Sequence, residues 1–128
     1  MAPAELPDCP YFLVTRSAMV ATQQLKQGLA EAGVGDVKPA YLGVLLVLWR
    51  EDGLLTADVA RRAALEPSTT TGLLDKLEGL GLVERRADPT DRRAVRIHLT
   101  DDGRALEPTV RSVVDRFMIA AAEGIDPQ

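Results

Sequence analysis

Polar and apolar residues alternate along one segment near the middle of the chain, which indicates a β-strand. Val95, Ile97 and Leu99 fall on one face of this segment, and more polar residues lie between them. The preceding residues 88–93 are rich in turn formers and include two adjacent arginines. With a first strand that begins near Leu82, the pattern predicts a two-stranded hairpin that carries guanidinium groups at its tip.

Helical periodicity appears on the N-terminal side of this hairpin. A first amphipathic helix is expected from about Tyr11 to Ala32, and Gly33 follows it as a stop signal. Pro39 suits the first turn of a second helix. The body of that helix is apolar nearly all round, so we expect it to be central and buried.

Two closely spaced helices are predicted directly before the hairpin. Residues 54–55 form a short strand, and Thr56 is the expected N-cap of a short helix that ends near Ala64. Pro67 suits the first position of the next helix, which runs to about Leu80. A short helix, a tight turn and a second helix form a helix-turn-helix arrangement.

A last helix is expected after the hairpin. Thr100 or Asp101 would cap its start, and Pro108 either kinks it or marks a late beginning. The apolar stripe of this helix comprises Leu106, Val110, Val113, Phe117 and Ala121. The predicted fold class is therefore mainly α with a small β-hairpin, in a single domain over residues 1–128.

Composition narrows the class of protein. The chain has 128 residues, of which 46% are hydrophobic and 27% charged, as expected for one folded domain. We expect no membrane association, because no apolar run is long enough to span a bilayer and no signal peptide is visible. One cysteine excludes an internal disulfide, and a cytoplasmic location is the expectation.

Positive charge is concentrated in the middle of an acidic chain. The formal net charge is −4, but residues 54–100 contain eight Lys or Arg against seven Asp or Glu. The formal net charge of this segment is thus +1, and that of the rest of the chain is −5. Because charges act within about 8 Å at physiological salt, one face of an acidic protein can still bind nucleic acid.

The helix that begins at Pro67 has two different faces. Its expected inward residues are Leu73, Leu74, Leu77 and Leu80. The opposite side carries Ser68, Thr69, Thr71, Gly72, Asp75 and Lys76. Hydroxyl groups and helix N-terminal amides suit phosphates, and threonine methyl groups suit thymine. Alone, this cluster would be a helix cap; before a basic hairpin, DNA contact is favoured.

Catalysis is not indicated. The single histidine, His98, lies on the polar face of the second hairpin strand. We find no nucleophile–base pair, phosphate-binding loop or metal-ligand spacing, so no enzyme activity, metal or cofactor is expected.

The run ADPTDRRAVRIHLTDDG resembles the wing signature of the multiple-antibiotic-resistance regulator (MarR) family of bacterial transcription factors. That signature has Asp-x-Arg at the wing tip, here Asp91 and Arg93, and then Leu-Thr-x-x-Gly, here residues 99–103. The preceding run LLDKLEGLGLVERR is similar to the end of the family's recognition helix and its first wing strand. The resemblance covers about Leu25 to Val114.

The resemblance implies a winged helix-turn-helix homodimer that binds a double-stranded, pseudo-palindromic DNA operator, as a repressor. The DNA-binding core would be residues 54–99, and the dimerisation helices residues 10–33 and 100–123. Members of the family usually continue past a segment like 124–128 into a further helix of the dimer interface. Dimerisation is thus expected to rely on the two helices present, or to be weak, or the chain is a fragment.

The resemblance also implies roles for single residues. The recognition helix would enter the major groove, Arg93 would enter the minor groove, and Asp91 would hold the guanidinium of Arg93. The alternative is that these two residues only brace the turn. One of Arg85 and Arg86 should pair with Asp75 or Glu78 while the other meets phosphate. The expected DNA-contacting residues are Ser68, Thr69, Thr71, Gly72, Lys76, Arg86, Arg92, Arg93 and Arg96.

Relatives commonly release DNA when a small aromatic ligand binds, so the resemblance implies a candidate effector pocket. The aromatic residues that could line it are Tyr11, Phe12, Tyr41, Trp49 and Phe117, each of which core packing explains as well. Some relatives sense peroxide through one cysteine near the first helix, and Cys9 resembles that placement. The alternatives to a ligand-responsive repressor are therefore a peroxide-sensing repressor and a winged-helix module that binds protein instead of DNA.

Overall fold

The chain forms helices and short strands in the order that the hydrophobic pattern predicts. The computed structural model describes residues 9–124, with side chains for residues 9–119. Its elements are α1 (Pro10–Glu31), the 3-10 helix η2 (Pro39–Tyr41), α2 (Leu42–Arg50), β1 (Leu54–Leu55), α3 (Thr56–Arg62), α4 (Pro67–Gly79), β2 (Val83–Ala87), β3 (Val95–Leu99), α5 (Asp101–Ala105) and α6 (Glu107–Gly124). The expected fold class, mainly α with a small β-structure, is confirmed.

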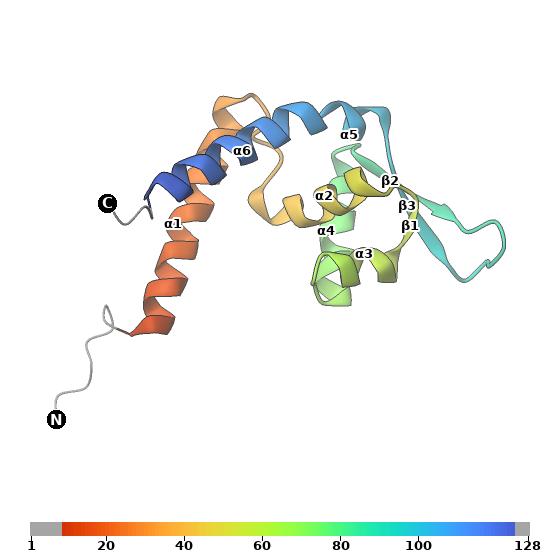
Figure 1. Ribbon diagram of the computed structural model, residues 1–128. Coiled ribbons are helices and arrows are strands. Elements are labelled where there is room, and N and C mark those ends of the chain that lie inside the picture. The colour runs from red at the N-terminus through yellow and green to blue at the C-terminus, as the bar shows by residue number, and fades with distance from the viewer. Residues whose placement is uncertain (1–8, 125–128) are drawn as a thin grey trace.

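Figure 1 shows two parts of the molecule. Helices α1 and α6 pack against each other at one end. Helices α2, α3 and α4 and the sheet lie at the other end, where the β2–β3 hairpin projects away from the helices. None of the described helices is long and apolar enough to cross a membrane.

The sheet has three antiparallel strands in the order β1-β3-β2, so the predicted hairpin and the short first strand are both confirmed. In the hairpin, Val83 lies opposite Leu99 and Arg86 opposite Arg96. Strand β1 pairs with the other edge of β3, where Leu54 lies opposite Ile97. The sheet therefore connects the hairpin to the segment that directly follows α2.

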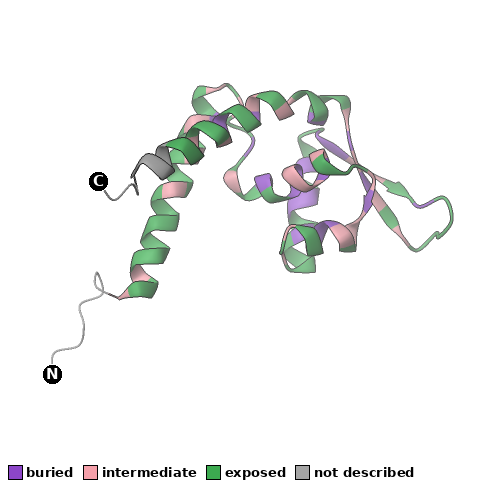
Figure 2. Cartoon of the chain, in the orientation of Figure 1, coloured by how far each residue is buried: buried purple, intermediate pink, exposed green. Residues whose placement is uncertain are grey.

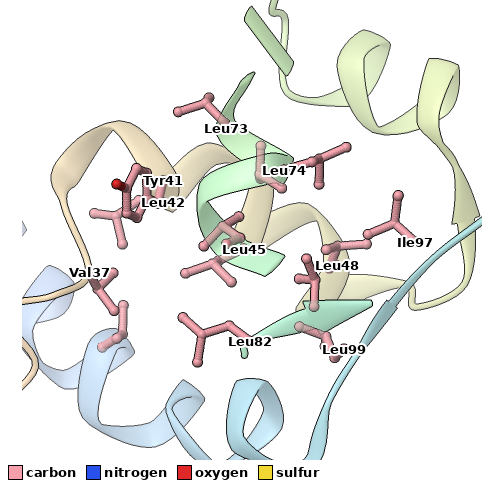
Figure 3. Packing of buried hydrophobic residues seen from close by; sticks show 14 of the residues in the cluster. Val37, Tyr41, Leu42, Leu45, Leu48, Leu73, Leu74, Leu82, Ile97 and Leu99 are labelled. Atoms are coloured by element: carbon pink, nitrogen blue, oxygen red, sulfur yellow. The ribbon is translucent and has the colours of Figure 1, made fainter. Parts of the chain in front are cut away.

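Helix α2 is the centre of the core, as its apolar sequence predicts. Leu45 is fully buried and Leu48 is 1% exposed, and they pack with Leu74 of α4 and Ile97 of β3 (Figure 3). Each such leucine contributes roughly 1.5–3 kcal/mol by leaving water. Figure 2 shows the contrast with α1, whose surface is exposed along most of its length. The apolar core thus fixes α4 and β3 relative to each other.

Two predicted details of the helices are wrong. Helix α3 begins at Thr56 itself, with Leu55 as its N-cap, and the hydroxyl of Thr56 donates to the carbonyl of Val95 at 3.4 Å. Leu80 was expected to face inward but is 40% exposed. Leu80 is the C-cap of α4, and its amide still donates to the carbonyl of Lys76 at 3.1 Å, so its exposure comes from its place at the helix end and not from a change of spacing.

The turn between α3 and α4 contains an unusual backbone conformation. Ala64 has a φ of 55°, in the left-handed region. This conformation costs a residue with a Cβ roughly 1–2 kcal/mol. The amide of Leu65 donates to the carbonyl of Ala60 at 2.9 Å, which stabilises the tight turn of the helix-turn-helix.

Strand β3 continues into the last helices through a single residue, Thr100. Its hydroxyl accepts a hydrogen bond from the amide of Gly103 at 3.0 Å and donates to the carbonyl of Gly81 at 2.6 Å. Its amide donates to the carbonyl of Leu82 at 3.0 Å. The predicted cap is therefore confirmed. Pro108 lies in the first turn of α6, so the alternative of a late helix start is the one observed.

Gly103 lies so close to the backbone that no side chain fits there. A Cβ at this position would overlap the carbonyl oxygen of Leu82, whereas a Cβ at Gly72 would meet nothing within 4 Å. We predict that Gly103→Ala lowers the free energy of unfolding by about 3 kcal/mol because the junction must shift. Gly72→Ala should raise it by roughly 0.5–1 kcal/mol through helix propensity. Urea unfolding measures both, and equal stabilities of the two variants would contradict the prediction.

Candidate nucleic-acid interface

The outer face of α4 carries the small polar residues that the sequence predicts for DNA contact. Ser68, Thr69, Thr71, Gly72 and Lys76 are all exposed. The open space above Gly72 would let another molecule approach the helix backbone closely. This face is therefore accessible and flat, and Lys76 is its basic residue.

Threonine 70, in the middle of the hydroxyl-rich run, has a different role from its neighbours. Thr70 is fully buried, and its hydroxyl donates to the carbonyl of Glu66 at 3.0 Å. Thr71 is exposed, and its hydroxyl donates to the carbonyl of Pro67 at 3.0 Å. Helical spacing thus divides the threonines between the core and the outer face.

The two arginines of β2 are held by acidic neighbours. Arg85 forms ion pairs with Asp75 at 2.8 Å and with Glu78 at 2.9 Å, both on α4. This confirms that one of the two arginines pairs with α4. Arg86 is exposed and pairs with Glu84 on the same strand. Arg85 therefore orients the hairpin against α4, and Arg86 is the one of the pair that remains accessible to a phosphate.

Asp88 organises the loop at the tip of the hairpin. Its side chain is 6% exposed, and its Oδ1 accepts hydrogen bonds from the amide of Thr90 at 2.8 Å, the hydroxyl of Thr90 at 2.7 Å and the amide of Asp91 at 3.1 Å. Its Oδ2 accepts one from Nε of Arg96 at 2.6 Å. The hydroxyl and amide of Thr90, and then Arg96, lower the pKa of the Asp88 carboxyl far below its usual range.

Asp91 has a role that differs from the predicted one. Its Oδ1 accepts a hydrogen bond from the backbone amide of Arg93 at 2.9 Å, not from the guanidinium group. The predicted side-chain pair is therefore wrong, because the short aspartate closes a local turn with the nearest amide. Asp91 shapes the loop and leaves the side chain of Arg93 free.

The arginines of the hairpin fall into two classes. Arg92 and Arg93 are exposed, and their guanidinium groups make no hydrogen bond or ion pair with any residue whose side chain or backbone the structure describes. Arg96 was predicted to contact DNA as well, but it pairs with Asp88, and its Nη1 donates to the carbonyl of Gly53 at 2.8 Å. Arg96 is thus bonded both to the wing loop and to the turn at Gly53, and its side chain is still 39% exposed.

The five aromatic residues proposed for an effector pocket do not come together. Tyr11 is 80% exposed, whereas Tyr41 is 5% exposed and belongs to the core. Trp49 donates from its indole to the carbonyl of Gly103 at 3.0 Å and so joins α2 to α5. Phe12 is half-buried near the start of α1. Phe117 does line a cavity, as described next.

A cavity of about 300 Å³ lies between α1 and α6. Its lining residues are Gln24, Leu25, Gly28, Glu31, Val113, Arg116 and Phe117. The apolar side chains of this lining are Leu25, Val113 and Phe117, and its charged residues are Arg116 and Glu31. Of the predicted aromatic residues, Phe117 is the one in this lining. Sequence reasoning missed the rest, because they come from two helices far apart in the chain.

Cys9 lies at the N-cap of α1 and is half-buried. Among residues 9–119, whose side chains the structure describes, no three His, Cys, Asp or Glu are arranged to hold a metal ion. The residues that precede Cys9 lie outside the described part of the chain.

Comparison with known proteins identifies this arrangement. A family model described as MarR family matches residues 35–94. A solved MarR-family transcriptional regulator from Rhodococcus sp. RHA1 is 30% identical, with a TM-score of 0.76 over 98% of this chain and 86% of its own. The chain belongs to the MarR family. Its hairpin is therefore the family's wing, and its α3 and α4 are the helix-turn-helix.

Other MarR relatives are similar over different lengths. CouR from Rhodococcus jostii RHA1, solved with p-coumaroyl-CoA, is 31% identical, with a TM-score of 0.76 over 97% of this chain and 85% of that one. A structure of the repressor CouR on a 23-mer DNA duplex is 26% identical, with a TM-score of 0.82 over 98% of this chain and 87% of that one. The regulator TtmR of Methylorubrum extorquens is 49% identical over 54% of this chain and 35% of its own length.

The chain spans only part of the curated relatives that it matches. It covers 35% of the length of TtmR and 63% of the length of the organic hydroperoxide resistance transcriptional regulator of Bacillus subtilis. What those whole proteins do therefore enters the proposal below and not the description of this chain.

The lowered pKa of Asp88 predicts a pH dependence of stability. A carboxyl whose pKa is lower in the folded state stabilises the protein above its unfolded pKa of about 3.9. That stability is lost as the pH falls through the folded-state value. Asp88→Asn should therefore unfold more easily than the wild type at pH 7, and the difference should shrink as the pH falls below about 4.

Thermal unfolding at a series of pH values checks this, with Asp115→Asn as the control. Asp115 is exposed on α6. A difference between Asp88→Asn and the wild type that stays constant down to pH 2 would contradict the role of the charged carboxylate.

Proposed function

We propose that the chain is a sequence-specific, DNA-binding transcriptional regulator that acts as a ligand-responsive repressor on a double-stranded operator. The observation that carries the proposal is the pair of exposed, unpaired guanidinium groups of Arg92 and Arg93 at the tip of the wing. The outer face of the recognition helix α4 is exposed as well. The repressor CouR, with the same fold and 26% identity, is solved on DNA, which supports this use of the two elements. Operator DNA as partner would place the regulator in the cytoplasm.

Local charge supports DNA binding by a chain whose net charge is −4. Arg93 lines a depression together with Thr56 and Ala57, so the end of the wing loop that carries Arg93 lies beside the start of α3. A cation here favours the narrow, negative minor groove, while α4 reaches the adjacent major groove. Because α4 offers hydroxyl groups and one lysine, phosphate and thymine contacts are favoured over direct reading of guanine.

A homodimer follows from the exposed apolar side chains of the two end helices. Residues Val14, Met19 and Val20 of α1 are 68%, 67% and 51% exposed, and Met118 and Ile119 of α6 are both 60% exposed. So much exposed apolar side-chain surface on two packed helices favours a partner that covers it. A second copy of the chain would cover it and would place two wings on one operator.

The ligand response is proposed from the cavity between α1 and α6. CouR, 31% identical, is solved with p-coumaroyl-CoA. A small aromatic effector, bound against Phe117 and Val113, would change how α1 and α6 pack and thereby the spacing of two wings. A peroxide response through Cys9 is the alternative, and it predicts a regulator that Cys9→Ser makes insensitive.

The main prediction concerns the tip of the wing. Arg93→Ala should weaken binding to an operator duplex by roughly 1–3 kcal/mol and reduce the salt dependence by about one counterion, because one guanidinium leaves the groove. Fluorescence anisotropy over a range of salt, on a duplex that the wild type selects from a random pool, measures both. Arg50→Ala removes an exposed charge from α2 and should bind like the wild type.

Two outcomes would contradict the proposal. Wild-type affinity of Arg93→Ala would exclude a groove contact at the tip. A wild-type chain that binds no duplex at low salt would favour the alternative of a protein-binding winged helix.

The second prediction concerns assembly. Light scattering should show a dimer, and Met19→Glu should shift it toward the monomer, because a buried charge would face the apolar surface of the partner. Ala105→Glu, on an exposed position of α5, is the control and should leave the dimer intact. A wild-type monomer at every accessible concentration would contradict the two-wing arrangement.

A further inference from the structure

Arg96 joins the loop of the wing to a distant part of the chain. It lies on β3, opposite Arg86 in the hairpin and opposite Leu55 of β1. Its Nε donates to Oδ2 of Asp88 at 2.6 Å, and its Nη1 donates to the carbonyl of Gly53 at 2.8 Å. One guanidinium group therefore bonds at the same time to the wing loop and to the turn that follows α2.

The wing-side partner of Arg96 is the residue that holds the loop together. Oδ1 of Asp88 accepts both donors of Thr90 and the amide of Asp91, and Oδ2 is left for Arg96. Asp88 is buried, so its charge has little water around it and depends on these four donors. The guanidinium of Arg96 supplies the positive charge that this carboxylate faces.

The other partner of Arg96 belongs to a rigid turn. Gly53 has a φ of 72°, and its amide donates to the carbonyl of Ile97 at 3.0 Å. The adjacent Asp52 accepts the amide of Leu99 at 2.8 Å through Oδ1 and an Nη of Arg104 at 3.1 Å through Oδ2. The turn is thus bonded to β3 and α5, and it is a fixed point against which the wing can be held.

We infer that Arg96 is a positioning residue for DNA binding: it acts through Asp88 to fix the wing tip relative to the turn after α2, and it does not itself contact DNA. The inference rests on the proposed function. Without the Arg96 bonds, the loop would be held through the β2–β3 ladder and the bond from Thr56 to Val95, and a two-stranded ribbon twists and bends easily. Arg92 and Arg93 would then reach the groove from many orientations, and fixing them would cost entropy on binding.

The DNA-binding test compares Arg96→Gln with the wild type on the duplex selected from a random pool, by anisotropy over a range of salt. Affinity should fall about tenfold, while the salt dependence stays that of the wild type, because no phosphate contact is lost. In a background that carries both Arg92→Ala and Arg93→Ala, Arg96→Gln should have little further effect, because both side chains that it positions are gone. Arg96→Lys should restore only part of the affinity, since a single ammonium cannot serve both acceptors.

A second measurement does not depend on DNA. Hydrogen exchange of the free protein should show faster exchange at the amides of Thr90 and Asp91 in Arg96→Gln, with the amides of the β2–β3 ladder unchanged. Arg50→Gln, which removes an equal charge from the surface of α2, should change neither exchange nor affinity.

The outcomes separate the inference from the proposed function. A loss of about one counterion from the salt dependence, with a loss of affinity that adds to that of the variant lacking both Arg92 and Arg93, would show that Arg96 contacts phosphate and would overturn the inference. Unchanged exchange at Thr90 and Asp91 would overturn it also. A wild type that binds no duplex would refute the DNA-binding proposal itself, whereas the exchange result would still decide whether Arg96 holds the loop.

Discussion

The burial of one negative charge, the carboxylate of Asp88, is the constraint on which the binding surface depends. A buried carboxylate is stable only when hydrogen-bond donors replace its water, and here the loop itself bends to supply three of the four. That bend shapes the loop between β2 and β3, which carries Arg92 and Arg93. The arginines at the tip are exposed because the loop's own backbone, and not their guanidinium groups, satisfies the acidic residues around them.

The distribution of ion pairs explains how an acidic chain keeps a basic site. Arg85 is neutralised by α4, Arg86 by Glu84, and Arg96 by Asp88. The pairs of Arg85 connect β2 to α4 and that of Arg96 connects β3 to the wing loop, so these pairs contribute mainly to the orientation of the wing. Among the described residues of this surface, Arg92, Arg93 and Lys76 make no ion pair, and Arg86 stays exposed beside Glu84. The net charge of the whole chain therefore says little about the electrostatic potential at this surface. A few unpaired groups dominate that potential within a Debye length.

Much of the fold follows from periodicity, because burial imposes a period of two on β3 and of 3.6 on the helices. The cap at Thr100 was predictable because a helix cap depends on the residue type at the helix start. The exposure of Leu80 was not predictable, because periodicity does not show that the helix end is left uncovered. The bonds of Arg96 were not predictable either, because alternation shows only that it is on the polar face; its acceptor at Gly53 is 43 residues away in sequence. The cavity lining was missed for the same reason, since its two helices meet only in the folded chain.

The junction at Thr100 limits how the two ends of the molecule can move. Only this residue separates β3 from α5, and three hydrogen bonds hold it to Gly81, Leu82 and Gly103. Trp49 adds a further bond from α2 to Gly103, and Arg111 of α6 lies over its ring at 5.8 Å. Because a single hydrogen-bonded residue links these elements, a displacement of α6 must either break these bonds or displace β3 as well. Because β3 carries Arg96, a change in the packing of the end helices reaches the wing through packed, hydrogen-bonded groups and not through a flexible linker.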